Sequence, residues 1–467
     1  MSDHTQPAHV RLAELAQQIR YTNMEREVIE GCKLILLDSI ACIAGGLAST
    51  PSAAAQSLAE EFGGPGTARV LGISKSVSVP MAVFANGTAL RYMDFNDYYF
   101  GRDPIHPSGS IPVALAIAEH LHLDGPTLLT AIAAAYELHI RLCDATGAPS
   151  LRARGWHHAS LLPVPAACIA GLMLTGDVRV AAHAMAIAAT HGGTLAQFQH
   201  GAIPTMKATA EAWAAKAAVE AAFLAWAGVT GPADIIGGSA GWGSCIAGAV
   251  DYDALLAPVA RLRVLDVCLK PYPVVAPATA VVHAAITIHN LPDFIPDDVE
   301  AVSVGVPEYV IAHNGDDPEK RFPSDRETAD HSYHYCAAVG LLDGACGGAQ
   351  FDEARIRAAD IRRILERTRL EPVPEFTSRW PTAAGGRVTV QMRDGRTLEV
   401  GFDYQIGHPK NPMGRSAVVA KLAEFCGGAA AARIEQAVDN LETCGDVADF
   451  ARTVDAALAG EPRKEEN

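Results

Sequence analysis

The sequence is poor in positive charge. Its 467 residues include 37 Lys and Arg against 53 Asp and Glu, which gives a formal charge of −16. Surfaces that bind nucleic acid or anionic membranes need clustered Lys and Arg, so this balance argues against both kinds of partner. A negative protein that binds an anionic metabolite must gather its cations at one place.

Paired cysteines and long apolar runs are also missing. The ten cysteines form no CxxC pair, and most lie in apolar stretches such as IACIAGG. This predicts buried free thiols in a reducing compartment, with neither disulfides nor a metal site. The run 161–175 contains two prolines and is shorter than a membrane span. Segment 1–18 lacks the continuous apolar region of a secretory signal, so we expect a cytoplasmic protein.

Apolar residues are plentiful, at 49% of the chain, and their three-to-four spacing predicts helices over most of residues 1–260. Segment 24–44 is one example, and it ends at Gly45-Gly46, which is typical of a helix terminus. Several helices are Ala-rich with two apolar faces, so we expect several packed helical layers. Further helices are predicted over 51–62, 80–93, 111–122, 126–144, 160–174, 178–190 and 205–228.

The pattern changes near residue 261. Strand-like stretches occupy 261–269, 299–307 and 386–402, the last a hairpin with Asp394-Gly395 at its turn. Helices are expected at 276–289, 326–343 and 353–367, and the helical pattern returns from 412. We therefore predict a mostly α, α+β protein: a large helical domain from 1–261 and 406–467, with a smaller α+β domain inserted at 262–405.

One polar loop stands out in the helical part. Segment 91–112 places Asp94 and His106 between two predicted helices. A carboxylate and an imidazole on one loop suit proton transfer, although capping and turn formation would also explain such residues. In GWHHAS, adjacent His157 and His158 follow a flexible Gly-Trp pair, and we expect at most one of them to face a pocket. A buried structural histidine is the alternative.

Two lysines could bind an anion. Lys207 precedes a long Ala-rich helix, and Lys270 follows a strand and precedes two prolines that fix the backbone. A solvated lysine is the alternative at both positions. A further motif, SDRETADHSYHYC, predicts that His331 and Tyr335 share one helix face, although core packing explains Tyr335 equally well. The sequence lacks a P-loop, a GxGxxG after a strand and a GxSxG elbow, which leaves no case for a nucleotide-binding protein or a serine hydrolase.

Taken together and in order, these motifs resemble the MmgE/PrpD family, whose members include dehydratases, decarboxylases and epimerases of carboxylic acids. The resemblance spans nearly the full length. It runs through MDFND…HPSGSIPVALAIAEH, GWHHAS, THGGTLAQF…TMKA, GVTGP, LKPYP and RETADHSYHYCAAVGLLDG.

The resemblance implies a helical domain with a smaller α+β lid, a homodimer, and a cofactor-free and metal-free active site at the domain junction for di- or tricarboxylates. It implies catalytic roles for His106, Asp94 and His157, and substrate binding by Lys207 and Lys270. Family members commonly carry a histidine shortly after the lid lysine, where this chain has Pro277, Ala278 and Thr279.

The expected function is therefore that of a carbon–oxygen lyase, a hydratase or dehydratase acting on an acid such as 2-methylcitrate, as in propionate metabolism. The TMKA motif looks closer to the dehydratase-like branch of the family. An isomerase, epimerase or decarboxylase of the same family is the nearest alternative. A carboxylate-binding protein without catalytic activity is the alternative from another class.

Overall fold

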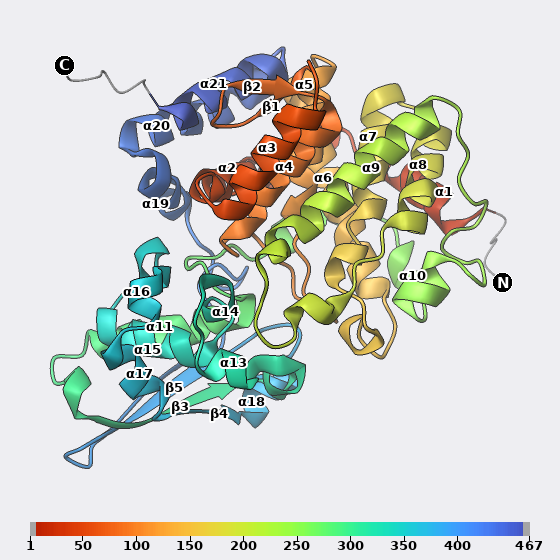
Figure 1. Ribbon diagram of the computed structural model, residues 1–467. Coiled ribbons are helices and arrows are strands. Elements are labelled where there is room, and N and C mark those ends of the chain that lie inside the picture. Colours follow the sequence, from red (N-terminus) through yellow and green to blue (C-terminus); the bar gives the residue numbers. More distant parts are fainter. Residues whose placement is uncertain (1–5, 461–467) are drawn as a thin grey trace, which may run out of the picture. The chain divides into compact units, whose positions relative to one another are not determined.

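The computed structural model describes residues 6–460. Residues 1–5, part of the N-terminal segment interpreted above, and residues 461–467 lie outside this part. The chain forms two compact units (Figure 1). The first, here the helical unit, comprises the described residues up to Ala196, Ala208–Val267 and the described residues from Gly414 on. The second, here the α+β unit, comprises Gln197–Lys207 and Cys268–Met413.

The predicted fold class, a mostly helical α+β protein, is confirmed. The extent of the α+β unit differs from the expected range of 262–405 in two ways. The insertion runs from Cys268 to Met413, and it also includes the earlier segment Gln197–Lys207. The amide of Ile203 donates to Thr328 Oγ1 at 3.0 Å and that of Gly201 to Asp317 Oδ2 at 3.2 Å. These contacts fasten the segment to the α+β unit.

Helices α7 and α8 show how the helical unit is packed. A Cβ at Gly171 would lie 2.8 Å from the Ala181 Cα, so the small residues allow the two backbones to approach closely. The stretch His158–Thr175 is by itself long and apolar enough to cross a membrane, but 72% of it is buried inside the protein. The helices are α1 (Ala8–Gln18), α2 (Arg26–Gly46), α3 (Thr50–Phe62), α4 (Val79–Tyr92), α5 (Ile111–His120), α6 (Gly125–Ala145), α7 (Pro163–Thr175), α8 (Val178–His191), α9 (Ala210–Trp226), α10 (Tyr252–Leu255), α19 (Arg415–Cys426), α20 (Gly428–Asp439) and α21 (Val447–Ala459), with a hairpin of β1 (Ala68–Val70) and β2 (Lys75–Val77).

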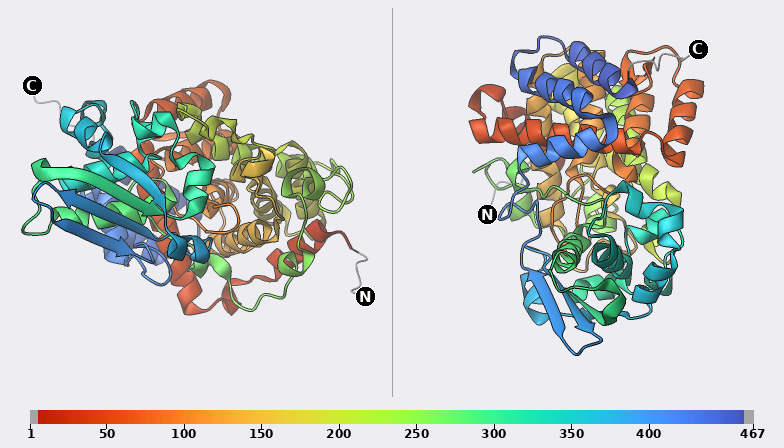
Figure 2. Two further views of the ribbon diagram at one scale, coloured as in Figure 1. Left: turned by 90° about the horizontal axis from the view of Figure 1, so that it is seen from below. Right: turned by 90° about the vertical axis from the view of Figure 1, so that its left-hand side faces the viewer.

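The α+β unit is built on a four-stranded sheet of order β4-β3-β5-β6, in which β3 and β4 are parallel and the other pairs antiparallel. Helices α11 and α15 lie side by side against this sheet (Figure 2). The strands are β3 (Val299–Val306), β4 (Thr368–Pro372), β5 (Gly386–Met392) and β6 (Thr397–Phe402); the helices are α11 (Thr279–His289), α12 (Glu308–Val310), α13 (Pro318–Arg321), α14 (Arg326–Ala329), α15 (Tyr333–Asp343), α16 (Glu353–Ile356), α17 (Ala359–Leu365) and α18 (Pro374–Arg379).

The predicted hairpin is present as β5 and β6, and Gly395 has a φ of 87° at its turn, a conformation that glycine adopts without strain. Three other expectations were wrong, one of them being the helix over 353–367, which is divided into α16 and α17. The stretch 261–269 contains a 3₁₀ turn, Arg263–Asp266, in place of a strand. The helix expected over 326–343 is split into α14 and α15 because Ser332 caps a new helix start. His331 lies in that break and does not share a helix face with Tyr335.

The cysteines agree with the expectation of free thiols. All ten lie within residues 6–460 and none is paired there; seven are buried and Cys245 is exposed.

Candidate active site

The loop that carries Asp94 and His106 follows α4 and leads into α5. Tyr99 and Ile105 exchange two backbone hydrogen bonds of 2.9 and 3.1 Å, which closes the loop into a narrow hairpin. His106 follows directly and precedes a 3₁₀ turn, Pro107–Ser110, at the start of α5. This short path fixes where the imidazole lies. The His106 residue is 6% exposed, so it belongs to the interior of the loop.

Asp97 organises the loop from within. Its carboxylate accepts hydrogen bonds from the Ser108 amide at 3.2 Å and the Tyr136 hydroxyl at 2.7 Å. Burial raises the pKa of this carboxyl to about 6. The Asp97 carbonyl oxygen lies 2.6 Å from Nδ1 of His106. Because a carbonyl only accepts, Nδ1 carries the proton, and Nε2 is the nitrogen able to take up another.

Asp94 is held in an unusual backbone conformation beside an arginine. Its φ is 51°, in the left-handed region where a short polar side chain is tolerated at some energetic cost. Arg91 binds the Asp94 carboxylate through Nη1, and its Nε lies 3.3 Å from Oε2 of Glu211. The buried guanidinium therefore balances two carboxylates, one from the loop and one from α9.

The adjacent histidines lie together. The ring centroids of His157 and His158 are 3.7 Å apart, and those of His106 and His158 are 5.2 Å apart. The two rings therefore lie side by side, with the ring of His106 next to that of His158. His157 is in extended backbone and His158 begins a 3₁₀ turn, and this change of direction brings the two rings to the same side.

The two rings have different partners. Nδ1 of His157 accepts from the Ala159 amide at 3.2 Å, so a neutral His157 carries its proton on Nε2. Nε2 of His158 lies 3.1 Å from Oε1 of Glu211. Burial lowers the pKa of His158, against the opposing effect of Glu211. Burial and the neighbouring His158 hold the pKa of His157 well below its usual range. Both rings are therefore neutral near pH 7.

A fourth imidazole completes what we call the imidazole cluster: His106, His139, His157 and His158. His139 comes from α6 and is 2% exposed, and neither of its ring nitrogens has a hydrogen-bond partner among residues 6–460. Burial lowers its pKa to about 3, with His158 contributing. Asn96 Oδ1 and Ser110 Oγ are likewise buried without partners in the described chain. Since buried polar atoms are normally satisfied, these three residues keep unused hydrogen-bonding capacity in the interior of the helical unit.

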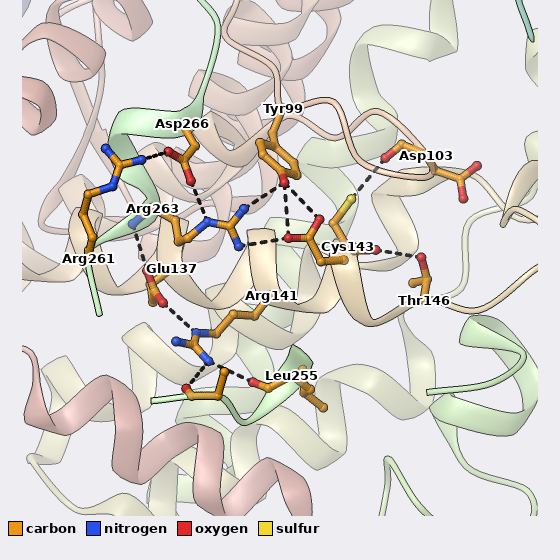
Figure 3. Close-up of polar contacts among 12 residues, drawn as sticks. Tyr99, Asp103, Glu137, Arg141, Cys143, Thr146, Leu255, Arg261, Arg263 and Asp266 are labelled. Carbon is orange, nitrogen blue, oxygen red and sulfur yellow. Dashed lines mark hydrogen bonds and ion pairs between the residues drawn. The ribbon is translucent and has the colours of Figure 1, made fainter. Parts of the chain in front are cut away.

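Two other contacts hold the loop in place. Arg263 binds Asp144 at 2.9 Å and Asp266 at 2.6 Å, and its Nη2 donates to the Tyr99 hydroxyl at 2.8 Å (Figure 3). We call this the Arg263 network. On another side, Lys421 of α19 donates to the Phe95 carbonyl and pairs with Asp38, both at 2.7 Å. The loop is thus fixed by residues far away in the sequence.

Lys207 lies in the α+β unit and is buried, at 3% exposed. Its Nζ lies 3.1 Å from both carboxylate oxygens of Asp330 and 3.4 Å from Nδ1 of His331, and His331 also contacts Asp330 closely. These three residues form what we call the lysine–aspartate cluster. The solvated lysine considered from the sequence is excluded at this position.

Lys270 is likewise fully buried, at 0% exposed, so the solvated alternative fails here too. The amide of Leu269 donates to the Gly407 carbonyl at 3.0 Å, and the amide of Val275 donates to the Asp330 carbonyl at 2.8 Å. The segment that follows Lys270 is therefore joined to the lysine–aspartate cluster through the Asp330 carbonyl.

Several site residues were not identified from the sequence. Glu211 and His139 lie in helical stretches without any motif. Arg91 lies in segment 91–112, where only Asp94 and His106 were predicted to be site residues. Glu211 is one of three charged residues in its Ala-rich helix, with Lys216 and Glu220, so its charge alone did not single it out. A burial pattern alone could not show that its carboxylate reaches His158.

Family comparisons agree with the fold and these motifs. The MmgE/PrpD N-terminal domain model matches residues 10–254 and the MmgE/PrpD C-terminal domain model matches residues 272–444. The chain belongs to the MmgE/PrpD family.

Individual relatives fall into two named activities. The chain is 28% identical over 346 residues to cis-aconitate decarboxylase from Mus musculus, covering 71% of this chain and 68% of that protein. It is 27% identical over 374 residues to 2-methylcitrate dehydratase from Cupriavidus necator, covering 74% of each chain. The similarity to the two activities is almost equal, so identity alone does not separate them.

Proposed function

We propose that this protein is a cofactor-independent lyase, a hydratase or dehydratase that acts on a small di- or tricarboxylic acid such as 2-methylcitrate. The observation that carries the proposal is His106. Its Nδ1 is fixed on the Asp97 carbonyl, which reserves Nε2 for proton transfer within a buried, polar cluster. The relatives named 2-methylcitrate dehydratase support a substrate of this class.

The proposed reaction removes a proton from the carbon next to a carboxylate. His106 Nε2 takes that proton, the C–O bond to the hydroxyl on the neighbouring carbon breaks, and a C=C bond forms. The departing hydroxide must receive a proton to leave as water, and the Nε2–H of His157 is the proposed donor. Asp94, paired with Arg91, would keep the local charge fixed as charge develops on the substrate.

Lys207 and Lys270 are the proposed carboxylate-binding residues. Both ammonium groups are buried, and Lys207 is oriented by Asp330. Buried cations bind an anion more strongly than solvated ones because water screens them less. In this acidic protein, these two lysines are the proposed local cations for binding an anionic substrate.

Decarboxylation is the second candidate, favoured by the relatives named cis-aconitate decarboxylase. In that reaction a C–C bond breaks, CO₂ leaves and an acid protonates the remaining carbanion, so the same residues would serve. An isomerase or epimerase of the same family would use the proton transfer alone.

Proton NMR in D₂O with purified protein and a panel of 2-methylcitrate, citrate, isocitrate and cis-aconitate tests the proposal. Formation of the unsaturated acid without CO₂ is the expected result. Release of CO₂ would indicate a decarboxylase, and deuterium incorporation alone would indicate an isomerase or epimerase. Saturable binding without turnover of any acid would indicate a carboxylate-binding protein and contradict catalysis.

We also propose that the protein is a homodimer. Trp213 and Leu224 on α9 are 49% and 47% exposed and lie eleven residues, or three helical turns, apart on one face. A second copy covering this face would remove their apolar surface from water. Sedimentation should give about twice the chain mass of 49.1 kDa, and Leu224→Arg should shift the protein toward monomer. A wild-type monomer at micromolar concentration would contradict the proposal.

A further inference from the structure

The imidazole cluster contains a set of atoms with the chemistry of a metal site. His106, His158 and Glu211 each offer one ligand atom, and the three atoms lie within 4.8 Å of one another. Two imidazoles and one carboxylate are a common protein ligand set for Zn²⁺, with the fourth position open to water. Tetrahedral bonds of about 2.0–2.1 Å need ligands about 3.4 Å apart, so small side-chain movements suffice.

The contacts of His106 and Glu211 orient their side chains. His106 donates from Nδ1 to the Asp97 carbonyl, which is the usual support for a histidine that binds metal through Nε2. Glu211 directs Oε2 toward Arg91 and Oε1 toward His158. Oε2 has no hydrogen-bond partner within residues 6–460, so Glu211 is not saturated by its present contacts.

The ligand types select the class of ion. Imidazole nitrogen suits Zn²⁺, Co²⁺, Ni²⁺ and Cu²⁺, whereas Mg²⁺ and Ca²⁺ prefer sites made of oxygen. An ion bound here would coordinate the nitrogen that the proposed reaction needs for proton transfer. Its effect would therefore be to stop the reaction.

We propose that His106, His158 and Glu211 form an inhibitory binding site for a divalent transition-metal ion of the Zn²⁺ type. The inhibition rests on the proposed function of His106, whereas the binding does not. The site differs from a resident metal centre because the protein is active without the ion and loses activity when the ion binds.

Co²⁺ is the probe for the binding. The full-length protein, treated with chelator and then freed of it, is titrated with Co²⁺ while visible absorption is recorded. We expect one Co²⁺ per chain, with the intense visible bands of four-coordinate cobalt that Zn²⁺ abolishes by displacement. His158→Ala and Glu211→Gln should each weaken binding at least about 10-fold.

The controls separate this site from other ligands. His191 on α8 and Cys245 are exposed, so His191→Ala and Cys245→Ser should bind Co²⁺ as the wild type does. Circular dichroism of each variant shows whether it is folded, and a folded Glu211→Gln keeps the test valid if His158→Ala unfolds. Absence of bands in the wild type, or unchanged binding in both ligand variants, would overturn the proposal.

The inhibition is measured separately. Zn²⁺ at concentrations that displace Co²⁺ should abolish turnover, and EDTA should restore it. Turnover that persists with the site filled would refute the inhibitory role. If Co²⁺ binds as expected and no acid is turned over even without metal, the ion site stands and the proposed function fails.

Discussion

The two clusters keep polar groups inside the protein in different ways. In the imidazole cluster, burial lowers the pKa of His139, His157 and His158, so these groups lose their charge. In the lysine–aspartate cluster, Lys207 is paired with Asp330, so a charged group is matched by its opposite. An imidazole can become neutral near pH 7 at little cost, whereas an ammonium with a much higher pKa needs a partner. The first arrangement leaves neutral imidazoles that can exchange protons, whereas the second holds an ammonium in a fixed position beside its counter-charge.

The largest expected effect is the loss of proton transfer at His106. Asn at this position can still donate from its side-chain amide to the Asp97 carbonyl, but it cannot exchange a proton. We expect His106→Asn to lower kcat about 10²–10⁴-fold with a small change in Tm. Turnover per folded molecule and Tm are measured together, with His191→Ala as the control. A variant within twofold of wild-type turnover would remove His106 from the mechanism.

The next effect tests charge pairing at Lys207. Asp330→Asn leaves a buried ammonium without its counter-charge, so we expect a loss of about 3–5 kcal/mol in unfolding free energy. The double variant Lys207→Met/Asp330→Leu should recover part of this loss but not the activity. Urea denaturation gives the stability and steady-state kinetics give KM. Glu220→Gln, which breaks the exposed Lys216–Glu220 pair on α9, should cost less than about 0.5 kcal/mol. If Asp330→Asn and Glu220→Gln lowered the unfolding free energy equally, the buried pair would contribute no more to stability than the exposed pair.

A smaller effect tests whether burial alone keeps a carboxyl group outside both clusters uncharged. Burial raises the pKa of Glu119 on α5 to about 7. Between about pH 4.5 and 7 the folded state holds a proton that the unfolded state has lost, so this carboxyl makes the protein less stable as pH rises over that range. Glu119→Gln stays neutral. Its stability relative to wild type should therefore increase by about 1–2 kcal/mol from pH 5 to pH 8.

Calorimetry of both proteins at several pH values measures this change. Glu60→Gln on α3, at an exposed position, is the surface control for the same substitution. A difference between Glu119→Gln and wild type that does not change with pH would mean that Arg69, which lies 3.2 Å from Glu119, keeps the carboxyl ionised.

The smallest expected effect concerns the Arg263 network, where charges are also paired but at partly exposed positions. Tyr99→Phe removes the hydroxyl that contacts Arg263 and Asp144. We expect a loss of about 1 kcal/mol in unfolding free energy and a modest fall in kcat, because the loop ending at His106 is held less firmly. Urea denaturation and kinetics measure both. An unchanged kcat with reduced stability would limit the network to a structural role.

The sequence predicted those features that depend on local patterns. Alternating residues and Asp394-Gly395 were enough for the β5–β6 hairpin, and three-to-four apolar spacing was enough for helices such as α2. The break at Ser332 was missed because a helix cap competes with an otherwise continuous helical pattern. The membership of Lys207 in the α+β unit was also missed, since it depends on contacts to residues more than 100 positions away.

The same distinction applies to the site. His106 and Asp94 became candidates because they lie in a polar loop between apolar helices, where such residues are conspicuous. Glu211 and His139 lie on helices, and only tertiary packing brings them to His158. The side-chain directions of adjacent His157 and His158 could not be predicted, because they depend on a turn that begins between them.

The bond from Lys421 to the Phe95 carbonyl has a consequence for the newly made chain. It joins positions 326 residues apart, so the loop with Asp94 and His106 leaves the ribosome long before its anchor exists. At about 5–20 residues per second this interval is roughly 15–65 s. During that time all four imidazoles have been synthesised, but the loop between Asp94 and His106 lacks its contact with Lys421. A chain that stops before Gly414 would contain every proposed catalytic residue and the Arg263 network, and would lack this contact to the Phe95 carbonyl.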